Sequence, residues 1–393
     1  MISELRLLTE KVAEFITGQP ASGAAEGRFE SLALEVFDFQ YRNIDLYREH
    51  CRRVNRSPSN VRRWGDIPAM PVLLFKHFFL YAGQLNDVTK TFCSSGTSSP
   101  RRYSQAHFST PGMRLMNLSI ETNAAQRLFP EDRLTRILVL APGPAQAPAS
   151  IMSYGMARLI TRFGVERSRF LVGANGLNLE EVISELRECQ NAETPVSLLG
   201  SSFGFVHLFD ALAERGLTFS LSQGSQVMHA GGYKGRSREI GPDDFIAMAQ
   251  SRLGVPARRV INLLGMTELA SQIYDCTSDS PDRDPSRSES TRRARRKIPP
   301  AWVRTRVVDP RALLNGEPAP VVAAGQAGVL WHLDLANVER PMAVQTEDLG
   351  VLLPGDEQGA GQAAGAGFEI LGRAEGAEMR GCSLSLEDFF RAH

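Results

Sequence analysis

A repeated order of apolar strand, turn and helix between residues 133 and 276 constrains the fold more than any other feature of this sequence. Short apolar runs end in glycine, proline or serine and are followed by helical periodicity, as in Val196–Gly200, which precedes a helix predicted to reach Arg215. Strands joined in this way run parallel and need helices on both faces of the sheet. The pattern predicts an α/β fold of mixed or largely parallel sheets flanked by helices.

Individual elements can be placed along the chain from the same signals. Strands are predicted at 133–140, 169–172, 196–200, within 225–235 and at the start of 259–276, where a helix-like restart is expected after Gly265. A helix is predicted over 178–190, with Asn178 as its cap. Residues 298–310 and 327–335 are typical of strands in an antiparallel or mixed sheet. Asp348 is expected to precede a turn. We expect a helical packing region at 1–66, a core at 67–371 and a short C-terminal stub at 372–393.

Composition excludes several classes of protein. The 393 residues are 42% hydrophobic, enough for a large core, and the 44 basic and 44 acidic side chains cancel. No nucleic-acid partner is therefore expected, and the basic run near residue 295 is preceded by acidic residues. No stretch predicts a membrane span or a signal peptide. Five scattered cysteines without Cys-x-x-Cys spacing argue against a disulfide framework or a zinc site and favour a cytoplasmic protein.

A run of small hydroxyl residues surrounds one glycine at residues 91–101. Its amides and hydroxyls could donate to phosphate oxygens from a nest-like turn, although a linker would have a similar composition. The run matches neither the Gly-x-x-x-x-Gly-Lys motif nor Gly-x-Gly-x-x-Gly. The candidate phosphate-binding residues are Ser94, Ser95, Gly96, Thr97 and Ser98.

Two later segments also place polar residues after predicted strands. Gly231 and Gly232 would let the backbone approach a flat group on which Tyr233 stacks, or would simply form a tight turn. In Gly265-Met266-Thr267-Glu268, a hydroxyl beside a carboxylate suits a phosphate contact next to a magnesium ligand. The alternative is that Thr267 caps a helix and Glu268 lies at its positive end.

Lysine occurs at only five positions, so each lysine in an apolar or glycine-rich setting is informative. Lys76 follows the apolar segment 67–75, and the favoured interpretation is structural, with its stem packed and its amine in solvent. Lys234 follows the glycine pair and is a candidate to supply positive charge to a phosphate. A surface lysine in a glycine loop is the alternative.

In this order and spacing, the motifs resemble the adenylate-forming superfamily, and most closely its acyl-protein synthetases of the LuxE type. The resemblance covers roughly residues 67–393. It is carried by residues 71–76, 94–98, 231–235, 297–302 with 309–310, 346–350 and 380–384. Such enzymes activate a carboxylic acid with ATP as an acyl-adenylate and pass the acyl group to a thiol.

The resemblance implies roles for individual residues. The 94–98 loop would hold the ATP phosphates, residues 231–233 the adenine, and Asp348 the ribose hydroxyls. Arg373 would lie near the ribose or phosphate, and Glu268 would bind Mg²⁺ beside Thr267. Cys382 would receive the acyl group, which implies an acyl reductase or a carrier protein as partner.

The chain also departs from the superfamily. Ser99 and Arg101 stand where a glycine and a lysine are common, and the sequence ends without the mobile lid that usually supplies an adenylation lysine. Two alternatives stay open for these reasons. One is an ATP-independent acyltransferase that uses acyl-carrier protein or acyl-CoA, and the other is a non-catalytic subunit or binding protein.

Cys93 is a rival to Cys382 as the acyl carrier because it lies inside the hydroxyl-rich run. A small side chain at that position can also pack beneath the loop. Cys382 follows a glycine near the carboxyl terminus, next to Arg380, and is the predicted carrier.

Overall fold

The computed structural model describes residues 2–18, 22–94, 103–231, 237–275, 296–309, 320–352 and 367–373. The chain divides into two compact units, each made of separate stretches of sequence. Unit 1 comprises residues 1–119, 266–271 and 288–393, and unit 2 comprises residues 120–265 and 272–287. The predicted boundaries at 66 and 371 stay predictions, because this division does not address them.

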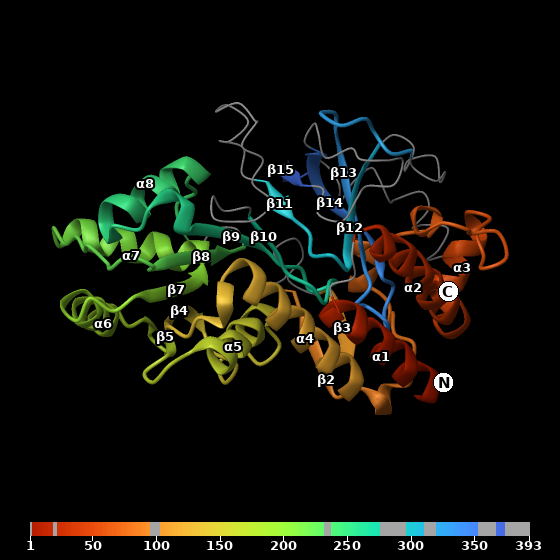
Figure 1. Cartoon of the computed structure of the whole chain (residues 1–393), viewed down its shortest axis with the longest axis horizontal. Coiled ribbons are helices and arrows are strands. Elements are labelled where there is room, and N and C mark those ends of the chain that lie inside the picture. The colour runs from red at the N-terminus through yellow and green to blue at the C-terminus, as the bar shows by residue number, and fades with distance from the viewer. Residues whose placement is uncertain are drawn as a thin grey trace. The chain divides into compact units, whose positions relative to one another are not determined.

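Unit 2 is built on a mostly parallel sheet (Figure 1). Its strands are β4 (Arg136–Pro142), β5 (Arg169–Gly173), β6 (Gly176–Leu177), β7 (Val196–Ser201), β8 (Gln226–Ala230), β9 (Val260–Leu264) and β10 (Ile273–Asp275). The pairs β9–β8, β8–β7, β7–β4 and β4–β5 are parallel, whereas β10 and β6 pair antiparallel with their neighbours. The strand and helix order predicted for this region is confirmed, apart from the helix expected after Gly265.

Helices cover both faces of this sheet (Figure 1). They are α5 (Ile151–Phe163), α6 (Leu179–Asn191), α7 (Ser202–Glu214) and α8 (Pro242–Leu253), with the short 3₁₀ helix η5 (Ala257–Arg259) before β9. One core cluster joins α6, α7 and α8 to alternate strand residues such as Leu138, Leu198 and Val227. The intervening strand residues, such as Val139 and Leu199, are buried as well. Because side chains alternate along a strand, both faces of the sheet are covered.

Local sequence signals explain where these helices begin and end. The Asn178 side chain accepts a hydrogen bond from the backbone of Glu181 at 3.3 Å, as predicted for the cap of α6. Ser201 caps α7 in the same way, by accepting from the Gly204 amide at 3.2 Å. Helix α8 ends at Gly254, whose φ of +69° is readily adopted only by glycine.

Unit 1 combines helices with an antiparallel sheet. Its α-helices are α1 (Ile2–Gly18), α2 (Ser22–Asn43), α3 (Asp45–Arg53) and the start of α4 (Thr110–Arg127). Its 3₁₀ helices are η1 (Trp64–Asp66), η2 (Val72–Lys76) and η3 (Leu85–Asp87). The remaining 3₁₀ helix, η4 (Pro130–Asp132), belongs to unit 2. Its strands are β1 (Met70–Pro71), β2 (Lys90–Cys93), β3 (Gln105–Phe108), β11 (Lys297–Ile298), β12 (Val303–Val308), β13 (Ala327–Asp334), β14 (Ala343–Leu352) and β15 (Phe368–Arg373). The predicted N-terminal helices and the antiparallel strands after residue 298 are confirmed.

Strand β14 is the centre of unit 1. It pairs antiparallel with β13 and, through its second half, with β15, while Val344 and Gln345 pair in parallel with β1. Strands β12 and β13 continue the sheet, and β2 pairs with β3 separately. Because β1 runs parallel to β14, the chain leaves β1 at the same end at which β14 approaches Asp348.

The turn between β13 and β14 is tied to α2. The Gln40 side-chain amide is buried and donates to the carbonyl oxygens of Asn337 (2.6 Å) and Val338 (3.1 Å), while its oxygen accepts from the Met342 amide at 3.1 Å. Gln40 therefore satisfies backbone groups of a turn that would otherwise be buried without partners.

Two local predictions are wrong. No helix follows Gly265, because residues 266–272 form turns that lead into β10. Asp348 does not precede a turn, since β14 continues through it and carries a register irregularity at Leu349 and Gly350. The interpretation of Thr267 as a helix cap therefore has no helix to support it.

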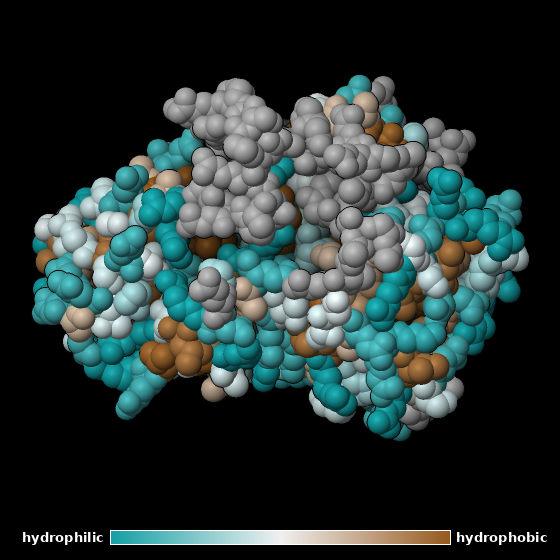
Figure 2. Space-filling model, viewed as in Figure 1, coloured by the Kyte–Doolittle hydropathy of each residue, from teal (hydrophilic) through white to brown (hydrophobic). Residues whose placement is uncertain are grey.

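The surface of the described residues is largely hydrophilic on the face shown in Figure 2, with small apolar patches between polar side chains. A search of the described helices found none with the length and apolar character needed to cross a membrane.

Candidate functional site

The predicted site residues fall into three groups. Ser94, Met266, Thr267, Glu268, Asp348 and Arg373 lie in unit 1, and Gly231 and Gly265 lie in unit 2. Ser95, Gly96, Thr97, Ser98, Gly232, Tyr233, Lys234 and Cys382 lie outside the described residues.

Glu268 lies on a short segment that the turn between β13 and β14 holds in place. The Asn337 amide donates to the Glu268 carbonyl oxygen at 2.7 Å. The Asp334 carboxylate accepts from the backbone and the hydroxyl of Ser271, both at 2.8 Å. Trp302 donates to the Ser271 hydroxyl at 2.9 Å. These bonds take the place of a helix in fixing the position of Glu268.

The Glu268 carboxylate is itself buried, at 5% exposure, and accepts a hydrogen bond from the Ser104 hydroxyl. The backbone of Ser104 exchanges hydrogen bonds with Ser94, whose amide donates to the Ser104 carbonyl at 2.9 Å and whose hydroxyl accepts from the Ser104 amide at 3.0 Å. The first residue of the predicted phosphate loop is thereby linked to Glu268 through one serine.

Lys76 also lies close to Glu268. It ends η2, directly after β1, and its ammonium group lies near enough to lower the pKa of Glu268. Lys76 is half-buried. The scarcity of lysine in the sequence singles out Lys76, but it does not indicate that Lys76 lies near Glu268. That position depends on the pairing of β1 with β14, in which Met70 and Val344 are 274 residues apart in sequence.

Asp348 and Arg373 face each other across β14 and β15. They are partners in the register of the two strands, and an oxygen of Asp348 lies 3.7 Å from Nε of Arg373. The Thr346 hydroxyl accepts from the Asp348 amide at 3.1 Å and donates to the Leu330 carbonyl at 2.9 Å. Arg373 is largely exposed, so its charge is available to a ligand near Asp348.

Burial sets the electrostatics of the two carboxylates. It raises the pKa of Glu268, which the negative charge of Asp348 raises further, while Ser104 and Lys76 act in the opposite direction. Burial likewise raises the pKa of Asp348, and Arg373 lowers it. Both acids would gain from a cation or from hydroxyl donors supplied by a ligand.

We call this cluster the Glu268 group; it comprises Lys76, Ser94, Ser104, Glu268, Asp348 and Arg373. Its cations and hydroxyls suit a phosphorylated ligand. No set of three or more His, Cys, Asp or Glu in the described part of the chain is arranged as a metal site. Mg²⁺ is usually bound by only one or two carboxylates together with substrate phosphates, and a buried hard-oxygen donor such as Glu268 fits that mode.

In unit 2, Gly231 follows β8 with a φ of +72°, which explains the glycine. Its carbonyl oxygen accepts from the Ser202 hydroxyl at 2.7 Å, and the same hydroxyl lies 2.9 Å from Nδ1 of His229. These groups lie at the carboxyl ends of parallel strands, where ligands bind in open α/β sheets. Ser202 and His229 had no distinguishing signal in the sequence. A Cβ at Gly265 would meet no described atom within 4 Å, so space does not explain that glycine.

Cys93 ends β2 and is partly exposed, and burial raises the pKa of its thiol. A raised pKa disfavours the reactive thiolate. This agrees with the packing interpretation of Cys93 and leaves Cys382 as the predicted acyl carrier.

Comparisons with known proteins give a consistent picture. The sequence profile of the family described as "Acyl-protein synthetase, LuxE" matches residues 23–391. The long-chain-fatty-acid–luciferin-component ligase of Vibrio harveyi is 24% identical over 359 residues, which cover 91% of this chain and 86% of the relative. The ligase of the same name from Aliivibrio fischeri is 22% identical over 361 residues, covering 91% of this chain and 87% of the relative.

Among solved structures, 2-hydroxyisobutyryl-CoA ligase in an open conformation, in complex with 2-HIB-AMP and CoA, has a TM-score of 0.61. The match covers 88% of this chain and 75% of the ligase at 14% sequence identity. A second structure of that ligase, in its thioesterification state, gives a TM-score of 0.60 over 90% of this chain and 69% of the ligase at 14% identity. The predicted α/β fold of an adenylate-forming enzyme is confirmed.

Proposed function

The chain belongs to the acyl-protein synthetase (LuxE) family and is an enzyme of that family, and from this premise we propose that it activates a long-chain fatty acid with ATP. The substrate class follows the shared name of the two relatives, long-chain-fatty-acid–luciferin-component ligase. The use of ATP follows the adenylate-forming fold and the Glu268 group.

The burial of Glu268 beside Lys76 and Asp348 is the single observation that carries the proposal. A buried carboxylate is costly, and a structural role would be served as well by an amide. A lysine, two serines and a second acid surround the Glu268 carboxylate. A charged, oxygen-rich ligand that completes the site would explain this arrangement.

In the proposed first step, a carboxylate oxygen of the fatty acid attacks the α-phosphorus of ATP, the bond to the bridging oxygen breaks and pyrophosphate leaves. Lys76 stabilises negative charge near Glu268, and Asp348 accepts hydrogen bonds from the ribose hydroxyls. Bound at Glu268, Mg²⁺ would neutralise phosphate charge. Ser104 keeps the Glu268 carboxylate oriented.

In the proposed second step, a thiolate sulfur attacks the acyl carbon and AMP leaves with the electrons of the broken acyl–phosphate bond. We propose Cys382 as this thiol and an acyl reductase or acyl-carrier protein as the next acceptor. Lys234 and the 95–98 loop remain candidates for phosphate contacts on the same basis of resemblance.

Exchange of labelled pyrophosphate into ATP tests the first step. We expect exchange only when a fatty acid such as tetradecanoate is present. Glu268→Gln and Lys76→Met should each reduce exchange about 100-fold, in the range of losing one charged group that stabilises a transition state. The control Lys11→Met removes only a surface pair with Glu35 and should retain full exchange. No exchange with any of a panel of acids would disprove acid activation, and acyl transfer without nucleotide would replace it with a simple acyltransferase.

Hydroxylamine-labile labelling by radioactive fatty acid tests the second step. Cys382→Ser should keep exchange and lose the label, whereas Cys93→Ala should keep both. A label that remains on Cys382→Ser or maps to Cys93 would show that another residue carries the acyl group.

A further inference from the structure

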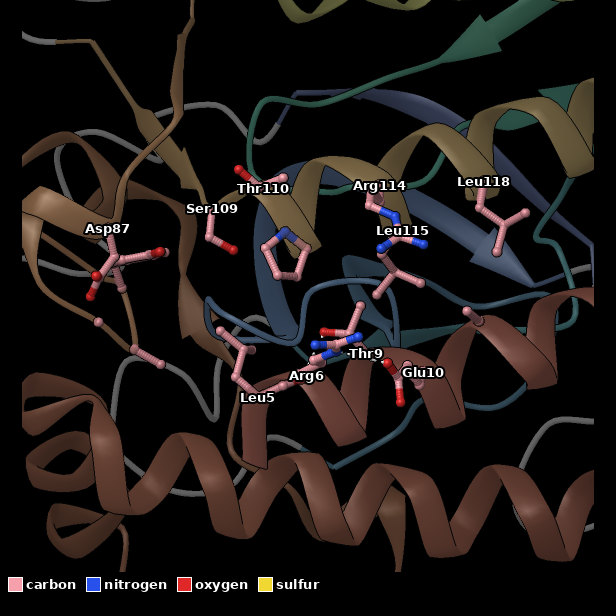
Figure 3. A pocket seen from close by; sticks show the side chains of 15 residues that line it. Leu5, Arg6, Thr9, Glu10, Asp87, Ser109, Thr110, Arg114, Leu115 and Leu118 are labelled. Carbon is pink, nitrogen blue, oxygen red and sulfur yellow. Dashed lines mark hydrogen bonds and ion pairs between the residues drawn. The ribbon is translucent and has the colours of Figure 1, made fainter. Parts of the chain in front are cut away.

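A cavity of about 660 Å³ lies in unit 1, between α1, residues 81–87 and the first turns of α4 (Figure 3). Its size falls within the range of about 300–1,000 Å³ that small-molecule sites occupy. None of its lining residues belongs to the Glu268 group. The cavity therefore needs an explanation of its own.

The two helices present apolar side chains to the cavity. Leu5 and Ala13 come from α1, and Pro111, Leu115 and Leu118 come from α4. In Figure 3, Leu115 and Leu118 extend from α4 towards α1, which carries Leu5. An alkyl chain placed there would be removed from water, at a gain of roughly 0.8 kcal/mol for each CH₂ that is fully buried.

Four charged side chains line the cavity, and two of them, Asp87 and Arg114, have no ion-pair partner among the described residues. Glu10 forms an ion pair with Arg6 at 3.0 Å, and the Asp87 carboxylate accepts a hydrogen bond from the backbone N–H of Gln84 at 3.1 Å. Arg114 makes no hydrogen bond or ion pair with any residue that the structure describes. Figure 3 shows its guanidinium group directed from α4 into the space above α1.

We propose that this cavity binds a long-chain carboxylate, with the alkyl chain against the leucines and the carboxylate on Arg114. A free guanidinium group beside an apolar wall selects an anionic amphiphile over a neutral lipid, because charge-assisted hydrogen bonds to carboxylates are strong. The site is separate from the Glu268 group, so the inference does not depend on ATP-dependent activation.

Photo-crosslinking of the full-length protein with a diazirine analogue of tetradecanoic acid tests the proposal. After irradiation and digestion, we expect labelled peptides from residues 2–18 and 103–127, whatever other peptides carry label. An excess of tetradecanoate should compete for these labels, and its methyl ester should compete at least tenfold less well because it lacks the charge.

Arg114→Met should weaken labelling of these peptides about tenfold or more. Leu118→Trp should weaken it as well, by filling the space. The control Arg62→Met removes an exposed arginine outside the cavity and should change nothing. Because Arg114 is itself exposed, its replacement is expected to leave the fold intact, which circular dichroism will verify.

Pyrophosphate exchange measured on the same variants separates this site from the proposed activity. We expect Arg114→Met to keep exchange at saturating acid while losing the label on α1 and α4. Three results would overturn the proposal: no label on these peptides, equal competition by the methyl ester, or loss of label and exchange together, which would make the cavity the activation site.

Discussion

Glu268 is a carboxylate whose burial opposes its own ionisation. Because its pKa is raised, the folded state holds the proton more tightly than the unfolded chain does. Above the ordinary pKa of 4.5, ionisation therefore costs the folded state more than the unfolded state, and stability falls as the pH rises. We expect Glu268→Gln to raise the free energy of unfolding at neutral pH by about 1 kcal/mol while it reduces pyrophosphate exchange about 100-fold.

Urea denaturation at pH 7.5 measures this change. Glu35→Gln is the matched control, since Glu35 is partly exposed and its carboxylate is bound by Lys11 and Ser31 near the surface. A destabilised Glu268→Gln protein would mean that the carboxylate serves the fold, and the case for a functional acid would be lost.

Burial of His332 has the opposite effect on the pH dependence of stability. Complete burial lowers its pKa to about 4, from 6.5 in the unfolded chain. Between these pH values the unfolded chain binds a proton at His332 and the folded state does not. The free energy of unfolding therefore has its full value above pH 6.5 and decreases as the pH falls towards 4. From pH 7 to pH 4 the wild type should lose about 3 kcal/mol more than His332→Asn. Parallel pH dependences for the two proteins would contradict this assignment.

At the scale of elements, the passage from β7 into α7 depends on Gly204. A Cβ at Gly204 would lie 2.6 Å from the Leu140 carbonyl oxygen, a backbone atom that cannot rotate away. We expect Gly204→Ala to destabilise unit 2 by about 1–3 kcal/mol through overpacking. Gly173→Ala is the control, because a Cβ there meets no described atom within 4 Å. Equal stabilities of the two variants in urea would show that β4 and α7 can move apart at low cost.

The elements also show which parts of the fold can be predicted from sequence. Caps such as Asn178 and the periodicity of α6 and α7 act within a few residues, so local patterns reveal them. The segment after Gly265 looked helical, but its backbone and Ser271 are bound by Asp334, 63 residues away. The place of Lys76 beside Glu268 likewise depends on a pairing between distant segments, that of β1 with β14. Partners so distant in sequence leave no local signal.

At the scale of the whole molecule, the two units can be followed separately in solution. The three tryptophans, Trp64, Trp302 and Trp331, all belong to unit 1, whereas helices occur in both units. Gln40→Ala leaves carbonyl groups of the β13–β14 turn unpaired and should destabilise unit 1 by about 2–4 kcal/mol. Its tryptophan-emission transition in urea should move to lower denaturant more than its circular-dichroism transition does.

Gly204→Ala, in unit 2, should show the reverse order of shifts. If both variants shift both signals equally, the chain unfolds as a single cooperative body.

The bond network of Gln40 also bears on how the chain is made. Gln40 is synthesised early, but its side chain donates to carbonyl groups that leave the ribosome some 300 residues later, which is the separation of Gln40 from Arg340. At about 5–20 residues per second, the N-terminal helices wait at least about 15 seconds for their partner turn. Unit 2 has most of its sequence, residues 120–265, available before then. Nascent chains halted before residue 334 should therefore hold a protease-resistant unit 2 beside N-terminal helices that are still degraded.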